Sequence, residues 1–109
     1  MARQDALQGS LPLLLLKLLG RRGPLHGYGM ATQIEGMSDD TLRVEEGSLY
    51  PALHRLEEAG WIKARWTTSD TGRRARMYEI TAAGRKQLQA EEERWKAITA
   101  AVGKILKHA

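Results

Sequence analysis

Hydrophobic positions at helical spacing between residues 46 and 60 predict a short amphipathic helix. Its apolar face comprises Leu49, Leu53 and Leu56, with Ala52 beside them. Its opposite face carries hydrogen-bonding, aromatic and basic groups: Ser48, Tyr50, Pro51, His54 and Arg55. We expect no acidic residue on that outer face before Glu58, so the face suits a partner of negative charge.

Proline and glycine positions predict where this helix begins and ends. Pro51 has no amide hydrogen and fits best in a first turn, which places the expected start near Gly47 or Ser48. Ser48 is then a suitable N-cap. Gly60 is expected to end the helix in the left-handed conformation.

The first half of the chain predicts two further helices. Leucines surround nearly the whole helix expected from Leu11 to about Arg21, with Ser10 as its cap and Pro12 in its first turn. A helix that is apolar on all sides needs cover on two sides, one from its own core and one from a second subunit.

The next expected helix opens at Leu25 and ends near Gly36 or Ser38. Its core-facing stripe is expected to comprise Met30, Ile34 and Met37. Leu42 and Val44 are expected to anchor the connection that follows. Two short helices joined in this way predict a helix-turn-helix pair.

Alternating residues after Gly60 predict a β-hairpin, with strands at 61–66 and 73–80 and a turn at 67–72. Trp61 and Trp66 are assigned to packing. Five cations and one acid lie between Trp61 and Tyr78, so the hairpin alone carries a charge equal to the +4 of the whole chain. The charged residues are Lys63, Arg65, Asp70, Arg73, Arg74 and Arg76. Arg76 shares strand parity with Tyr78, so we expect its stem to pack along the hairpin.

The last predicted helix begins after Thr81 as its cap and runs to about Lys107. Two apolar rows with seven-residue spacing, interrupted by Glu91, indicate a coiled-coil-like seam and hence a homodimer. The expected dimer interface comprises Leu14, Leu18, Leu88, Trp95, Ile98, Val102 and Ile105.

Together these elements predict a mainly α fold with a small β-hairpin (α+β). Residues 1–81 form a winged helix-turn-helix domain, and residues 82–109 form a C-terminal dimerisation helix. The longest apolar run is too short for a membrane span, no signal peptide is apparent and cysteine is absent, so a cytoplasmic protein is expected. His26, His54 and His108 are scattered, so we expect no metal, no cofactor and no enzymatic activity.

A polar and basic helix beside a basic hairpin is typical of a winged helix that binds double-stranded DNA. The expected DNA contacts are Tyr28, Ser48, Tyr50, Pro51, His54, Arg55, Arg73 and Arg74. Arg55 suits guanine, Tyr50 and Ser48 suit phosphates, and Arg73 and Arg74 suit the backbone or minor groove. Which of them contact bases stays open, and Tyr28 is equally suited to the core or to a phosphate.

Four blocks of the chain resemble the PadR family of bacterial transcriptional regulators. They are Gly9-Ser-Leu-Pro-Leu-Leu, His26-Gly-Tyr-Gly-Met30, Gly47-Ser-Leu-Tyr-Pro-Ala-Leu-His-Arg-Leu-Glu57 with Gly60, and Gly72-Arg-Arg with Tyr78 and Thr81. The resemblance implies a repressor that binds an inverted repeat, and the single C-terminal helix resembles the short subfamily. Met77 stands where many relatives have an aromatic residue.

The resemblance leaves the effector open. Some multidrug-binding relatives stack flat aromatic ligands between two symmetry-related tryptophans at the place of Trp95, so the alternative function is a sensor of small aromatic ligands. Packing in the dimer seam is the favoured interpretation of Trp95, because apolar residues at seam spacing usually pack. A protein–protein adaptor is a further alternative, but it would need an apolar or acidic outer face on the helix at 46–60.

Overall fold

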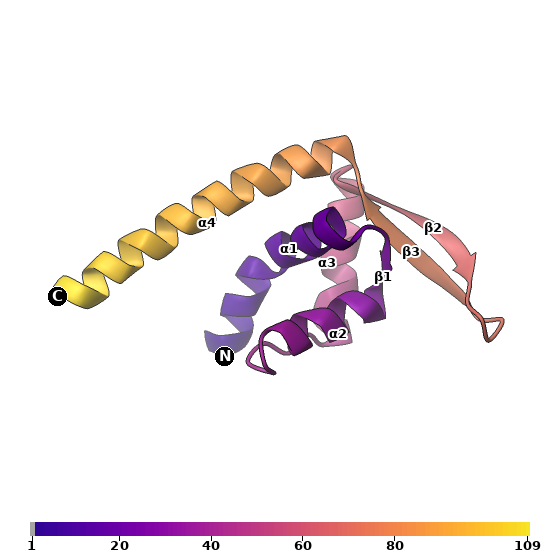
Figure 1. The fold of residues 1–109 in the computed structure, drawn as a ribbon, viewed down its shortest axis with the longest axis horizontal. Helices are drawn as coiled ribbons and strands as arrows, with labels where there is room; N and C mark the ends of the chain where they lie inside the picture. Colours follow the sequence, from indigo (N-terminus) through magenta and orange to yellow (C-terminus); the bar gives the residue numbers. More distant parts are fainter. Residues whose placement is uncertain (1) are drawn as a thin grey trace.

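The structure, a computed structural model, describes residues 2–109, with side chains from Gly9 onwards. The elements in chain order are α1 (Ala2–Arg22), β1 (Leu25–His26), α2 (Gly27–Met37), α3 (Glu46–Glu58), β2 (Ile62–Thr68), β3 (Arg74–Ile80) and α4 (Ala82–His108). Figure 1 shows α1, α2 and α3 gathered together, with the β2–β3 hairpin, here called the wing, projecting to one side and α4 to the other. Within the described residues, no helix is both long and apolar enough to cross a lipid bilayer.

The core forms where α1, α2 and α3 meet the base of the sheet. Side chains that are almost fully enclosed include Leu11, Leu15, Leu16, Leu19, Met30, Leu49, Leu53 and Ile62. The predicted apolar face of α3 is therefore confirmed, as is the burial of Ile34 and Val44. Met37 was wrongly assigned to the core: it is the last residue of α2 and is 65% exposed.

Helix α1 begins earlier than the sequence predicted, at Ala2 rather than Leu11, so Ser10 is not its N-cap. Pro12 lies inside the helix and removes one backbone hydrogen bond, a local cost that the burial of leucines on α1 outweighs. Leu14 and Leu18 were expected to face a second copy, and for Leu18 this expectation was wrong. Leu18 is only 6% exposed and belongs to the chain's own core, so it offers almost no surface to a second copy.

The segment before α2 is a strand, where the sequence predicted the start of a helix. Leu25 pairs with Tyr78, and His26 pairs with Met77, so β1 completes a three-stranded antiparallel sheet in the order β1-β3-β2. The His26 ring strengthens this pairing, because its Nδ1 donates to the carbonyl oxygen of Arg76 at 3.0 Å. The sheet therefore joins the helix-turn-helix pair to the wing.

The predicted start of α3 was wrong and its predicted end is confirmed. The helix begins at Glu46 with Glu45 as N-cap, which leaves Ser48 inside the first turn and Pro51 in the second. Gly60 adopts the left-handed conformation, with φ of +80°. Its amide donates to the carbonyl of Glu57, and the next amide donates to Leu56, each at 3.0 Å, which completes a Schellman cap.

The wing is confirmed as an antiparallel hairpin. Its register pairs Ile62 with Ile80 at the base and Thr68 with Arg74 near the tip. The turn closes through two backbone hydrogen bonds, from Ser69 to Arg73 at 2.8 Å and from Gly72 to Ser69 at 2.9 Å. Gly72 has φ of +80°, a conformation that glycine adopts without a steric cost.

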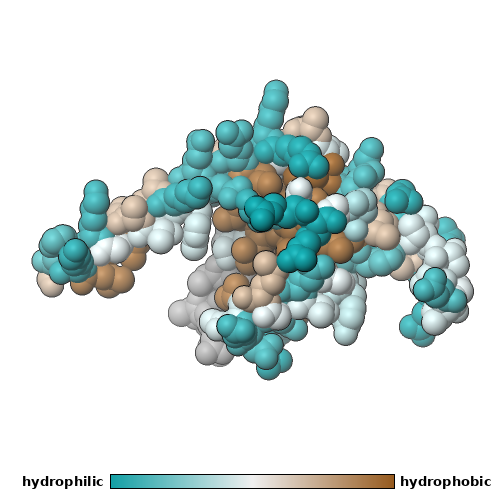
Figure 2. Space-filling view, in the orientation of Figure 1, coloured by the Kyte–Doolittle hydropathy of each residue, from teal (hydrophilic) through white to brown (hydrophobic). Residues whose placement is uncertain are grey.

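Helix α4 begins as predicted, because the Thr81 hydroxyl oxygen accepts a hydrogen bond from the Gly84 amide at 3.0 Å. Its first turns pack on the rest of the chain: Leu88 is half-buried against the core, and Lys17 of α1 forms an ion pair with Glu92 at 3.0 Å. Every residue from Glu93 onwards is exposed. Figure 2 shows apolar residues, in brown, along the lower edge of the far end of α4.

Candidate nucleic-acid interface

The outer face of α3 presents its predicted contact residues to solvent. Tyr50, Pro51, His54 and Arg55 are all exposed, and Ser48 is half-buried. Among the described residues, no acidic group forms an ion pair with Arg55, whereas His54 lies 3.6 Å from the carboxylate of Glu58. The guanidinium of Arg55 is therefore available to an external acceptor.

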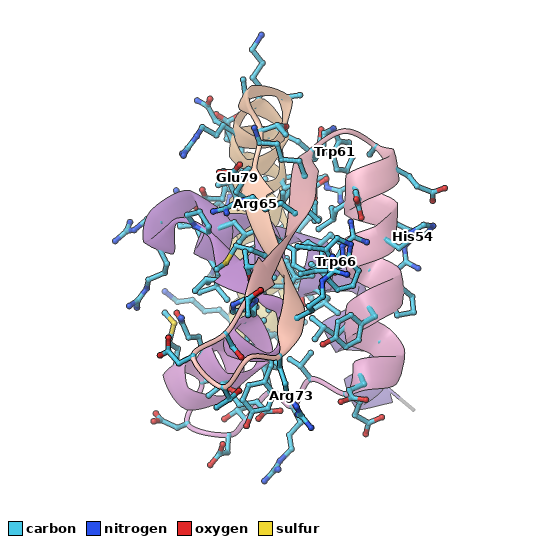
Figure 3. The ribbon with its side chains drawn as sticks, turned by 90° about the vertical axis from the view of Figure 1, so that its right-hand side faces the viewer. His54, Trp61, Arg65, Trp66, Arg73 and Glu79 are labelled. Carbon is cyan, nitrogen blue, oxygen red and sulfur yellow. The ribbon has the colours of Figure 1, made fainter. Side chains whose placement is uncertain are left out.

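A cleft of about 550 Å³ separates α3 from the wing. Its lining combines aromatic, basic and histidine side chains with one acid: His26, Tyr28, Tyr50, His54, Glu57, Trp66, Arg74, Arg76 and Tyr78. Figure 3 looks onto the wing and shows Trp66 on the side where His54 lies on α3, while Arg65 and Glu79 lie on the other side. The cleft thus gathers four of the eight expected DNA contacts, namely Tyr28, Tyr50, His54 and Arg74.

The other expected contacts lie outside the cleft. Ser48, Pro51 and Arg55 belong to the outer side of α3, and Arg73 lies in the turn at the tip of the wing (Figure 3). The open question about Tyr28 is answered by its exposure of 78%, which excludes a place in the core. Its hydroxyl is accessible at the start of α2, directly beside the cleft.

One acid lies in the cleft, contrary to the expectation that the outer face has none before Glu58. Glu57 is half-buried, and its Oε2 accepts a hydrogen bond from Nη2 of Arg76 at 2.9 Å. This ion pair joins α3 to β3 and neutralises the carboxylate. Behind it, burial raises the pKa of the Tyr78 hydroxyl, while the Arg76 cation opposes that rise and Glu57 adds to it.

Trp66 was expected to pack in the wing or core, but its ring is 58% exposed in the cleft. The guanidinium carbons of Arg74 and Arg76 lie 4.9 Å and 5.6 Å from its ring centroid, and Arg76 also lies 5.9 Å from the Tyr78 ring. The expectation that Arg76 packs along the wing is therefore confirmed. The sequence missed the stacking role of Trp66, although the pairing of Trp66 with Arg76 follows from the hairpin register.

The uncovered part of α4 forms a second surface of interest. Trp95, Ile98, Val102 and Ile105 are 51%, 49%, 47% and 64% exposed. A hollow of about 260 Å³ beside Trp95 is lined by Gly9, Ser10, Leu13, Glu91, Arg94, Trp95 and Ile98. Glu91, the polar residue in the predicted seam, accepts hydrogen bonds from Gln87 and Arg94 at 2.8 Å and 3.0 Å. Among the described residues, no three histidine or acidic side chains cluster as metal ligands would.

Comparison with known proteins places this architecture among regulators of transcription. Residues 15–90 match the model of the transcriptional regulator PadR-like family. A transcriptional regulator from Clostridium thermocellum has a similar structure, with a TM-score of 0.83 and 30% identity over 92% of this chain and 96% of that one. The transcriptional regulator Rv3488 of Mycobacterium tuberculosis is 39% identical over 64 residues, which cover 59% of this chain and 56% of that protein.

A second similar structure contains nucleic acid. Bacillus subtilis PadR in complex with operator DNA has a TM-score of 0.66 and 29% identity, covering 73% of this chain and 45% of that one.

Proposed function

The chain belongs to the PadR-like family of transcriptional regulators, and we propose that it binds double-stranded DNA sequence-specifically as a homodimer and acts as a repressor in the cytoplasm. Helix α3 enters the major groove and the wing contacts the backbone or the minor groove. The observation that carries this proposal is the exposed polar face of α3, which includes Arg55, beside a wing whose exposed Arg74 lines the cleft between them. That face is neither apolar nor acidic, as a protein–protein adaptor would require.

The homodimer is proposed from the second half of α4, which its own chain leaves uncovered. Apolar side chains at seam spacing gain stability when a second copy buries them, so the region 82–109 is proposed as a dimerisation helix attached to the 1–81 DNA-binding domain. The proposed contacts are Leu14, Leu88, Trp95, Ile98, Val102 and Ile105, and Leu18 is left out because it is only 6% exposed within its own chain. An inverted-repeat operator then presents half-sites about 34–36 Å apart.

A gel shift against the promoter region of the protein's own operon tests the proposal. We expect a shifted complex that weakens steeply with salt, because phosphate contacts release counterions. Arg55→Ala should reduce affinity for the operator more than affinity for random duplex of equal length. Equal losses on the two duplexes would assign Arg55 to phosphate contact, and absence of any complex at low ionic strength would refute DNA binding.

Release from the operator is proposed to follow when an effector binds one dimer geometry better than the other, since equal affinity for both would shift nothing. The hollow beside Trp95 favours a small aromatic effector as a second candidate function. Planar cationic dyes should then quench tryptophan fluorescence, and Trp95→Ala should abolish the quenching although Trp61 and Trp66 remain. Equal quenching in the variant would exclude this site.

A further inference from the structure

The side chain of Trp66 lines the cleft and is not part of the hydrophobic core. It lies opposite Arg76 in the hairpin register, and Arg74 lies two residues earlier on the same face of β3. Both guanidinium groups lie over the ring, with Arg74 the closer at 4.9 Å. A guanidinium at such a distance is attracted by the negative face of the indole.

The two arginines are nevertheless in different situations. Arg76 is half-buried, pairs with Glu57 at 2.9 Å and also lies over Tyr78, so its charge is already matched within the chain. Its Nε is buried without a hydrogen-bond partner among the described groups, and the rings of Trp66 and Tyr78 lie against the same guanidinium. Arg76 is therefore committed to joining the wing to α3.

Arg74 is exposed, and no acid in the described part of the chain pairs with it. Its one charge-specific contact within that part is the Trp66 ring. An arginine at the free end of a hairpin otherwise samples many rotamers, and a contact that restricts these rotamers reduces the entropy lost on binding.

We propose that Trp66 is a positioning residue for DNA contact, which stacks on Arg74 and holds its guanidinium at the mouth of the cleft where a duplex phosphate arrives. The inference rests on the DNA-binding function proposed above. Trp66 carries no charge and contributes through Arg74. The ion pair between Arg76 and Glu57 holds a second guanidinium against the same ring and so supports this stack.

A double-mutant cycle with Trp66→Ala and Arg74→Ala, measured on one fixed duplex over a range of salt concentrations, tests the proposal. Arg74→Ala should lower the salt slope by about 0.9, the value for one phosphate contact. Trp66→Ala should weaken binding roughly two- to five-fold, the range for an exposed cation–π contact, and should lower the salt slope although it removes no charge. The double variant should bind like Arg74→Ala alone, and Trp66→Phe should recover part of the loss.

Arg65 provides the matched control, because it is also an exposed wing arginine but lies on the face of β2 opposite Trp66 (Figure 3). Trp66→Ala and Arg65→Ala should have additive effects. Additive effects of Trp66→Ala and Arg74→Ala, or an unchanged salt slope in Trp66→Ala, would overturn the positioning role and leave DNA binding intact. If the wild-type protein binds no duplex at low salt, the proposed function fails and this inference fails with it.

Discussion

Replacing Gly84 with alanine would test how the first turn of α4 is fixed to the rest of the chain. A Cβ at this position would lie 2.0 Å from the carbonyl oxygen of Trp61 and 2.7 Å from Cγ1 of Ile80. The carbonyl cannot simply turn aside, because it accepts the Thr81 amide at 3.0 Å. The helix must therefore retreat by roughly 1.3 Å to reach an ordinary carbon–oxygen separation of about 3.3 Å.

If the helix pivots at the Lys17–Glu92 ion pair, its far end moves in the opposite direction. Gly84 and the Lys17–Glu92 ion pair lie roughly 12 Å apart along α4 at a rise of about 1.5 Å per residue. A shift of roughly 1.3 Å over that length tilts the helix by about 6° and moves Ile105, roughly 20 Å beyond Glu92, by about 2 Å. The apolar rows that meet a second copy in the proposed homodimer would no longer align.

The expected energetic cost is substantial. Overpacking typically costs about 1–3 kcal/mol, and a clash with backbone belongs at the upper end of that range. Removal of a helical glycine returns about 0.5–1 kcal/mol, so we expect a net loss of about 2 kcal/mol. For a chain of this size that loss lowers the thermal midpoint by on the order of 10 °C.

Gly103→Ala is the matched control, because it makes the same substitution in the same helix where, apart from nearby atoms of the helix's own backbone, no atom of the described residues lies within 4 Å of the added Cβ. It should stabilise the protein by about 0.5–1 kcal/mol. Thermal denaturation and sedimentation equilibrium of both variants give the comparison, with a lowered midpoint and a weaker dimer expected only for Gly84→Ala. If both variants melt above the wild type and dimerise equally, the steric account of this junction is wrong.

Three further predictions concern other parts of the fold. Thr81→Ala should lower the free energy of unfolding by about 1 kcal/mol in chemical denaturation, because the α4 cap is lost, and Thr81→Ser should retain most of the wild-type stability. Burial raises the pKa of the Tyr78 hydroxyl in the folded state, so the stability it contributes is complete below the pKa of the unfolded state and is lost as pH rises through the folded-state pKa. Denaturation at neutral and alkaline pH should therefore show a smaller alkaline loss in Tyr78→Phe than in the wild type, and equal losses would contradict this assignment. Ile98→Glu should dissociate the dimer in sedimentation experiments whereas Ala97→Glu, next to it but outside the seam rows, should not, and a dimer that survives both changes would place the interface elsewhere.

The spacing of apolar residues correctly predicted those elements whose buried face is set by their own sequence. The leucines of α3 fall at helical spacing and pack as that spacing requires. Gly60 and Thr81 marked the end of α3 and the start of α4, because each has a local conformational or hydrogen-bonding role that the residue type itself indicates. The sequence predictions failed where packing between elements determined the structure. Helix α1 continues through Pro12, since buried leucines outweigh one lost hydrogen bond.

The sequence predicted which faces of α3 and the wing carry the site residues, but not which side chains contact one another. Alternation along the hairpin places Trp66 and Arg76 on one side of the wing, but their contact depends on cross-strand register. The ion pair between Glu57 and Arg76 depends on the angle between α3 and the wing, which the sequence alone does not specify. Strand β1 was missed because two residues are too few to form an alternating pattern.

The short strand β1 limits how such a molecule can be switched. It pairs the start of α2 with β3, while the Glu57–Arg76 ion pair joins α3 to the same strand, so both helices are linked to the wing as one body. We therefore expect a signal that reaches α4 in the proposed homodimer to leave α3 and the wing of each copy in the same relative positions. It can act by changing the separation or rotation of two such bodies, in the way that subunits turn about an interface. Control of the proposed homodimer would then depend on the distance between its two copies of α3.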